Sequence, residues 1–148
     1  MRLSLILSLI ILMLVPGLFA ADPGIRIGTY TDAGEFFAGV EILTPLSPQV
    51  YFNPNIEYLF IDYGDLMTLN LDVHYDFPTR SNMLYWVGAG LGVQYFDPAE
   101  GGESGTDAGL NILGGLGLVT RGGIIPYTQA KVVVGDVEEF VLAVGLRF

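Results

Sequence analysis

The sequence predicts an all-β fold: an eight-stranded antiparallel up-and-down transmembrane β-barrel preceded by a cleavable signal peptide. Three observations lead to this prediction. The chain opens with an apolar run that has the features of an export signal. Apolar and polar residues then alternate with a period of two through most of the remaining sequence. The final strand carries aromatic residues at both ends of its apolar face, as membrane barrel strands do.

Residues 1–21 are expected to be the signal peptide. Arg2 supplies the positive charge, residues 3–15 are apolar apart from two serines, and Pro16-Gly17 precedes the small residues Ala20 and Ala21. The apolar run is shorter than the roughly 20 residues that a spanning helix needs. We therefore expect cleavage after Ala20 or Ala21, which leaves residues 22–148 as one outer-membrane barrel domain.

The charge of the chain is strongly acidic and unevenly distributed. It holds 16 Asp and Glu against 6 Lys and Arg, with a formal net charge of −10, yet 51% of its residues are hydrophobic. Eleven of the carboxylates cluster in four polar connections without Lys or Arg: Asp32 and Glu35; Asp62 and Asp65; Asp97, Glu100, Glu103 and Asp107; Asp136, Glu138 and Glu139. Without a basic stripe, nucleic acid is excluded as a partner. The clusters are interpreted as solvated turns, with divalent-cation binding at a lipopolysaccharide surface as the alternative.

Eight segments alternate in hydrophobicity, and the connections between them alternate in kind. The predicted strands are residues 24–30, 35–43, 50–58, 67–77, 83–96, 108–119, 124–135 and 140–148. Turns marked by Pro45 and Pro48, by residues 78–81 and by residues 121–123 alternate with the four acidic connections. Pro54 and Pro126 fall inside predicted strands, where proline cannot donate to the ladder. Short turns at one end and longer polar loops at the other are typical of an up-and-down membrane barrel.

The alternation assigns two faces to these strands. The apolar face of the second to sixth strands carries Phe36, Ala38, Val40 and Ile42; Val50, Phe52, Ile56 and Tyr58; Leu69, Leu71, Val73, Tyr75 and Phe77; Tyr85, Val87, Ala89, Leu91, Val93 and Tyr95; Leu110, Ile112, Leu116 and Leu118. The opposite face is rich in glycine, asparagine and charged residues. A soluble lipocalin-like barrel would show the same period with its apolar face inward.

Two features favour an apolar face that points outward into lipid. Its aromatic residues gather at two levels, Phe36, Tyr58, Tyr95 and Phe140 at one rim and Phe52, Tyr75, Phe77, Tyr85 and Phe148 at the other. Such paired girdles are expected at the two membrane interfaces. The glycines of the other face would weaken the strands of a soluble exterior, whereas a narrow lumen needs small residues.

The C-terminal strand resembles one protein family. Residues Phe140, Leu142, Val144, Leu146 and Phe148 form an apolar face that ends on an aromatic residue, and the chain is similar to the small eight-stranded outer-membrane barrels of the outer-membrane protein A and protein X type. The resemblance covers essentially the whole of residues 22–148. It implies that this ending is the signal read by the barrel-assembly machinery.

The polar face predicts a charged network inside the barrel. Its members are Arg26, Glu41, Glu57, Asp72, His74, Asp76, Lys131 and Arg147. Because isolated buried charges are costly, these charges should pair. We expect Arg26 to pair with Glu41 and Asp72 to pair with Lys131 across the lumen. An eight-stranded barrel is just wide enough for side chains to fill it, so a structural plug is favoured over an ion gate.

No catalytic, cofactor or metal site is predicted. His74 is the only histidine, and the serines outside the signal peptide, Ser47, Ser81 and Ser104, lie in connections. A lipid-modifying serine–histidine–carboxylate set would need these groups together. One histidine and no cysteine exclude an ordinary zinc site, and the loop from Asp97 to Asp107 does not have the spacing of an EF-hand.

The sequence therefore predicts a non-enzymatic bacterial outer-membrane protein with a structural or surface-interaction role, a plugged polar lumen and acidic extracellular loops. Its expected partners are outer-membrane lipid, lipopolysaccharide and the barrel-assembly machinery, and no surface partner is identified. The alternatives are a narrow ion-conducting channel, a lipid-modifying outer-membrane enzyme, and a soluble periplasmic lipocalin-like binder.

Overall fold

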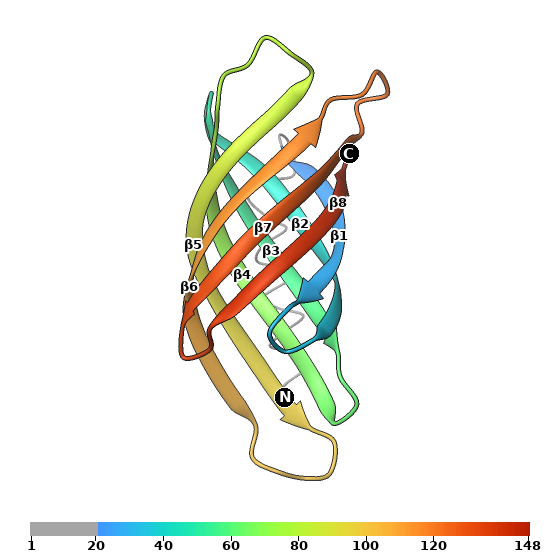
Figure 1. Cartoon of the computed structure of the whole chain (residues 1–148), viewed down its shortest axis with the longest axis vertical. Coiled ribbons are helices and arrows are strands. Elements are labelled where there is room, and N and C mark those ends of the chain that lie inside the picture. Colours follow the sequence, from blue (N-terminus) through green and yellow to red (C-terminus); the bar gives the residue numbers. More distant parts are fainter. Residues whose placement is uncertain (1–20) are drawn as a thin grey trace.

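The computed structural model describes residues 21–148, so the expected signal peptide falls outside the described residues except for Ala21. Eight strands make up the fold: β1 (Asp22–Tyr30), β2 (Glu35–Ser47), β3 (Val50–Phe60), β4 (Gly64–Asp76), β5 (Met83–Pro98), β6 (Gly105–Leu118), β7 (Ile125–Gly135) and β8 (Glu139–Arg147). Each pairs antiparallel with the next, and β1 pairs with β8 to close the barrel (Figure 1). The predicted all-β barrel is confirmed. No helix among the described residues is long and apolar enough to cross a membrane.

The strands coincide with the predicted segments and differ from them mainly at their ends. β2 continues through Pro45 to Ser47, and β4 begins at Gly64, three residues before the predicted start. The backbone tolerates Pro45 because the register with β3 shifts between Pro45 and Ser47, a bulge that relieves the regular ladder.

The two prolines that counted against the prediction are also accommodated. Pro54 pairs with Leu71 of β4, whereas β2 pairs with β3 at Glu41–Asn55 and then next at Thr44–Phe52. The ladder is therefore interrupted on the β2 side, where the N–H of Pro54 is missing. Pro126 is the second residue of β7, and the pairing of β7 with β6 extends only to Tyr127. Pro126 therefore lies beyond the ladder with β6 and is paired only with Leu146 of β8, so its missing N–H costs no hydrogen bond to β6.

The barrel has two chemically different ends. At the end that we call the acidic end lie the connections 31–34, 61–63, 99–104 and 136–138; at the other, the terminal end, lie residues 48–49, 77–82 and 119–124. β1 begins and β8 finishes at the terminal end, which is uppermost in Figure 1. The eleven clustered carboxylates lie in or beside the four acidic connections, whereas the exposed Arg80 and Arg121 lie at the terminal end.

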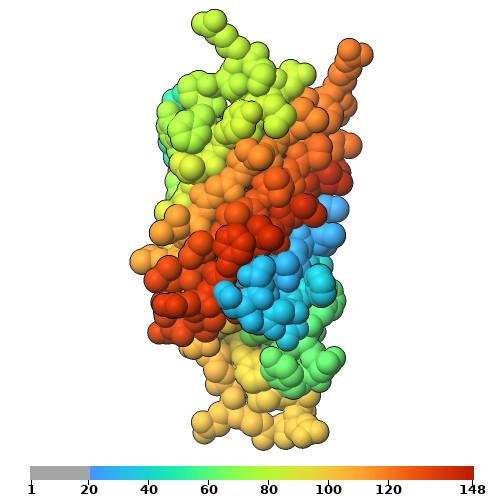
Figure 2. Space-filling view, viewed as in Figure 1, coloured from blue at the N-terminus to red at the C-terminus, as the bar shows by residue number. Residues whose placement is uncertain are grey.

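The outer face of the barrel is apolar and exposed. Phe36 is 69% exposed, Ile112 61% and Ile27 59%, and large aliphatic side chains cover all eight strands. Figure 2 shows this surface over β6, β7, β8 and β1. The polar face points inward, which is the reverse of a soluble barrel with an apolar core. Of the expected girdle residues, Tyr58, Tyr75, Phe77, Tyr85, Phe140 and Phe148 are also exposed, while Phe52 and Tyr95 are partly buried.

Candidate functional site: the barrel lumen

The interior of the barrel holds a charge-balanced set of buried side chains. Three cations, Arg26, Lys131 and Arg147, and three carboxylates, Glu41, Glu57 and Asp72, are each at most 2% exposed. His74 is 1% exposed, and Asp76 is half-buried near the terminal end. Because a buried charge is costly unless it is paired, an equal number of both signs is what a dry lumen requires.

Glu41 organises the part of the lumen near the terminal end. Arg147 donates from Nε to Glu41 Oε1 at 2.9 Å, and Asn53 donates to Oε2 at 3.1 Å. Arg26 Nη1 lies 3.6 Å from Glu41 Oε2, an ion pair without a close hydrogen bond. The guanidinium of Arg147 also stacks over the rings of Tyr127 and Trp86, at 4.4 and 4.8 Å from their centroids. Cation–π contacts of this kind stabilise a desolvated guanidinium.

Glu57 organises the middle of the lumen. Arg26 Nη2 lies 3.2 Å from Oε1, Lys131 Nζ lies 3.2 Å from Oε2, and the Tyr30 hydroxyl donates to the same Oε2. Glu57 thus shares its charge between two cations, and Arg26 bridges Glu41 and Glu57. The structure therefore joins five of the expected lumen residues, Arg147, Glu41, Arg26, Glu57 and Lys131, into one network of ion pairs that crosses the barrel.

Lys131 does not form the expected ion pair with Asp72. The carboxylate of Asp72 accepts hydrogen bonds from Asn55 and Asn111 at 3.1 and 2.9 Å, while Lys131 reaches Glu57 and Asn70. The longer side chain of Glu57 reaches the ammonium group, whereas the short side chain of Asp72 is held by the amides of Asn55 on the adjacent β3 and of Asn111 on β6. The alternation of side chains along a strand predicts which residues point inward, but it does not predict whether Lys131 pairs with Glu57 or with Asp72.

An ordered series of amides connects Asp72 to Lys131. Asn111 donates to Asn70 Oδ1 at 2.8 Å, Asn70 donates to Asn55 Oδ1 at 2.9 Å, and Asn55 donates to Asp72. Because Asn111 Nδ2 also donates to the Asp72 carboxylate, its amide orientation is determined by acceptors on both sides. Hydrogen-bonded side-chain networks of this kind rigidify an interior, although Asn111 Oδ1 stays without a partner.

Six large apolar or aromatic side chains also fill the lumen, and the alternation pattern did not identify them. Tyr30, Phe37 and Leu59 pack with Val141 and Ala143 in one cluster, and Trp86, Leu113 and Tyr127 form another. They were left out because the prediction lists only polar side chains for the lumen, although the alternation along each strand places these residues on the inward face as well. A usable signal was present in the register: Phe37, Trp86 and Tyr127 each face a glycine, Gly28, Gly115 and Gly145, on a neighbouring strand.

His74 does not belong to a catalytic set within the described residues. Neither ring nitrogen has a hydrogen-bond partner, and the ring stacks on Trp86 at 6.0 Å with an interplanar angle of 9°. Ser81 and Ser104 lie in connections, and Ser47 is the exposed last residue of β2. A buried histidine without an orienting carboxylate lacks the geometry that nucleophilic catalysis needs. Residues 21–148 also contain no cluster of three or more metal-ligating side chains.

A closed eight-stranded barrel with an apolar exterior and a polar, filled interior is the class of structure to which this chain belongs. No protein-family model matches the chain, and no curated protein sequence matches it significantly. Solved structures do match. The N-terminal β-barrel domain of Pseudomonas aeruginosa OprF superimposes with a TM-score of 0.71 at 19% identity, over 86% of this chain and 96% of that one.

Two further solved structures share the fold. Neisserial surface protein A matches with a TM-score of 0.60 at 19% identity, over 86% of this chain and 92% of the other. The outer membrane enzyme PagL matches with a TM-score of 0.53 at 13% identity, over 85% and 96%. These likenesses confirm the resemblance to small outer-membrane barrels at the level of the fold.

Proposed function

We propose that this protein is a bacterial outer-membrane barrel with a structural or surface-interaction role. The observation that carries the proposal is the combination of an apolar exposed exterior with a filled, charge-balanced lumen. Such an exterior is stable in lipid and would aggregate in water. The expected signal peptide and the structural neighbours that are described as outer-membrane proteins, PagL and Ail, support the same location.

We propose that the acidic end faces outward and that the terminal end, with Arg80 and Arg121, faces the periplasm, because β1 begins and β8 finishes at the terminal end and the expected assembly signal of β8 ends there. Loop length does not support this orientation. The predicted contrast between short turns and longer loops is wrong, since the acidic connections span 4, 3, 6 and 3 residues and those of the terminal end span 2, 6 and 6. Because the lumen is occupied by side chains, the surfaces available for interaction are the acidic loops. One structural neighbour is itself described as a surface protein.

The first experiment is fractionation combined with heat-modifiability on a gel. The full chain is expressed in a Gram-negative host, outer membranes are isolated, and boiled and unboiled samples are compared. We expect the protein in the outer-membrane fraction, with a shift in mobility on boiling because the folded barrel resists mild detergent. Recovery as a soluble periplasmic protein that shows no shift would overturn the proposal in favour of a soluble binder.

A narrow ion channel is a second candidate, favoured by the sharing of Glu57 between Arg26 and Lys131. A carboxylate with two cationic partners can release one of them while it stays paired. Single-channel recording in planar bilayers separates the candidates. The structural role predicts no steady conductance from the wild type, whereas a channel predicts discrete openings that Lys131→Glu alters.

The lipid-modifying alternative is tested separately, by comparing lipid A mass spectra of cells with and without the protein. Unchanged spectra would argue against that alternative.

A further inference from the structure

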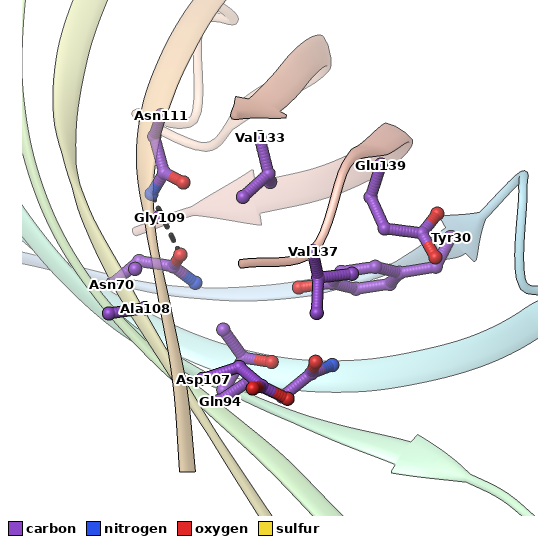
Figure 3. A pocket seen from close by; sticks show the side chains of 12 residues that line it. Tyr30, Asn70, Gln94, Asp107, Ala108, Gly109, Asn111, Val133, Val137 and Glu139 are labelled. Carbon is purple, nitrogen blue, oxygen red and sulfur yellow. Dashed lines mark hydrogen bonds between the residues drawn. The ribbon is translucent and has the colours of Figure 1, made fainter. Parts of the chain in front are cut away.

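A small cavity lies where the lumen opens at the acidic end. Tyr30 of β1, Thr68 of β4, and Asp107 and Asn111 of β6 line it, together with Val133 and Val137 around the end of β7. Its volume is about 20 Å³, which is enough for one water-sized group. Figure 3 shows the lining side chains converging on this space from opposite sides of the barrel.

The cavity presents buried oxygen atoms that have no hydrogen-bond partner. Asn111 is 1% exposed, and its Oδ1 is unpaired. Its Nδ2 is committed to Asn70 and Asp72, so the oxygen must point away from them; in Figure 3 it faces the side on which Val133 lies. The Thr68 hydroxyl, 6% exposed, faces the Tyr30 hydroxyl but makes no hydrogen bond of normal geometry. Unpaired buried acceptors are costly, so a donor that fills this space is stabilised.

The charge around the opening is uniformly negative. Asp107 and Glu139 are among the lining residues, and none of the lining residues is a cation. Of the five Lys and Arg among residues 21–148, three are buried in the lumen and two lie at the terminal end. Lys131 reaches Asn70 at the base of the cavity, but Glu57 holds it at 3.2 Å. The acidic connections therefore attract cations toward this opening.

We propose that this cavity binds a primary ammonium group on an alkyl chain. An ammonium group has three donors and no acceptor, which complements the unpaired oxygens of Asn111 and Thr68. The methylene groups behind it would lie against Val133 and Val137, as the stems of lysine side chains lie against apolar surfaces elsewhere. Asp107 and Glu139 at the rim would balance its charge. This inference concerns the folded barrel and stands apart from the proposed surface role.

An alkylammonium fits the lining better than a metal ion. Calcium takes six to eight oxygen ligands, commonly several carboxylates, whereas this cavity has two carboxylates on different strands and apolar walls. A water molecule fits the volume but brings no charge to the acidic rim. The ligand chemistry is that of a free polyamine or of a lysine side chain on another protein.

The test is a titration of the purified, folded protein in detergent micelles with n-butylammonium chloride at constant ionic strength. The readout is the side-chain amide resonance of Asn111. We expect a saturable shift, and affinity about five-fold weaker in Thr68→Val, since one hydrogen bond contributes about 1 kcal/mol. Asp107→Asn should also weaken binding by several-fold. Glu103→Gln is the matched control, because it removes a nearby loop charge outside the cavity lining.

Several results would overturn the inference. These are the absence of saturation, an equal response to tetramethylammonium (which has no N–H), or equal weakening by Glu103→Gln and Asp107→Asn. Displacement of the amine by calcium at lower concentration would assign the site to a metal. Every variant is first checked for heat-modifiability, so a misfolded protein is not counted. Spermidine and Nα-acetyl-lysine amide are then compared, because tighter binding of one identifies a free polyamine or a protein lysine as the source.

Discussion

Glycines set the packing inside this barrel, residue by residue. Trp86 lies opposite Gly115, Tyr127 opposite Gly145 and Phe37 opposite Gly28, and Asp72 and His74 lie opposite Gly90 and Gly88. A Cβ on Gly145 would approach the Tyr127 ring to 2.5 Å. At these positions a large side chain crosses the narrow lumen over a residue that has no side chain. The glycine content of the polar face is therefore a packing requirement.

This arrangement predicts a strong contrast between two adjacent glycines of β6. A Cβ at Gly115 would lie 2.2 Å from Trp86 Cζ2, whereas a Cβ at Gly114 on the outer face would meet only the Trp86 carbonyl oxygen at 3.6 Å. Gly115→Ala should lower the free energy of unfolding by about 1–3 kcal/mol through overpacking, and Gly114→Ala should leave it unchanged or slightly raise it. Urea unfolding in micelles, followed by the fluorescence of the single tryptophan, measures both. Equal effects would refute the packing argument.

The sharing of Glu57 predicts a second residue-scale effect. Glu57→Gln leaves two buried cations, Arg26 and Lys131, with less compensating charge. Removing one partner of a buried ion pair typically costs about 3–5 kcal/mol, so a loss of that order is expected in the same unfolding assay. Glu100→Gln, in an exposed connection, should change stability by less than about 0.5 kcal/mol. A Glu57→Gln barrel as stable as the wild type would show that the network contributes little.

Individual partners were harder to predict than faces. Parity along each strand was sufficient to place Arg26, Glu41 and Lys131 inside, because side chains alternate between faces. It could not place Lys131 against Glu57, since that contact depends on side-chain length and on the amides that already hold Asp72. The same alternation places Trp86 inward, because Tyr85 and Val87 point outward, but a prediction that lists only polar side chains for the lumen leaves Trp86 out.

Among the elements, β8 closes the barrel and carries the expected assembly signal. At the acidic end the connection after β1 and the start of β8 are joined reciprocally: Phe140 N donates to Asp32 Oδ2 at 3.0 Å, and Asp32 N donates to Glu139 Oε2 at 3.3 Å. At the terminal end Phe148 N donates to the Pro23 carbonyl at 2.9 Å. Hydrogen bonds at both ends of the barrel therefore hold β1 and β8 together, and they are made by residues close to the ends of these strands.

If the terminal strand is an assembly signal, two exposed aromatic residues should behave differently in cells. Phe148 is 52% exposed and Phe36 is 69% exposed, so neither packs into the lumen. Phe148→Ala should reduce the amount of heat-modifiable barrel in the outer membrane several-fold at equal expression, whereas Phe36→Ala should not. Refolding of both purified variants into micelles should succeed to a similar extent. An equal loss for the two variants in cells would assign Phe148 to the girdle alone.

The elements themselves were largely predictable because every strand here has one apolar and one polar face. The differences occurred where backbone chemistry overrode the pattern. Pro45 suggested a turn, but a bulge lets β2 continue to Ser47. Pro54 counted against β3, yet it lies where the ladder with β2 is interrupted. Alternation predicts which residues share a face. It does not predict whether a proline ends a strand or is accommodated by a bulge or by a gap in the hydrogen-bond ladder.

At the scale of the whole molecule, the chain separates its charges along the barrel axis. The clustered carboxylates occupy the acidic end, the lumen is balanced, and the exposed cations occupy the terminal end. A barrel with this distribution attracts cationic groups at one mouth only. The position of the proposed ammonium cavity at that mouth follows from the same distribution.

The separation of charge also fixes where a protease can act. Trypsin cleaves after lysine and arginine, and within the described residues only Arg80 and Arg121 are exposed, both in connections at the terminal end. Intact cells treated with trypsin should therefore leave the folded protein uncut, whereas permeabilised cells should yield fragments that end at these two arginines. Cleavage in intact cells would mean that the barrel is inserted the other way up. The natural sequence thus contains its own reporter of orientation, with no added tag.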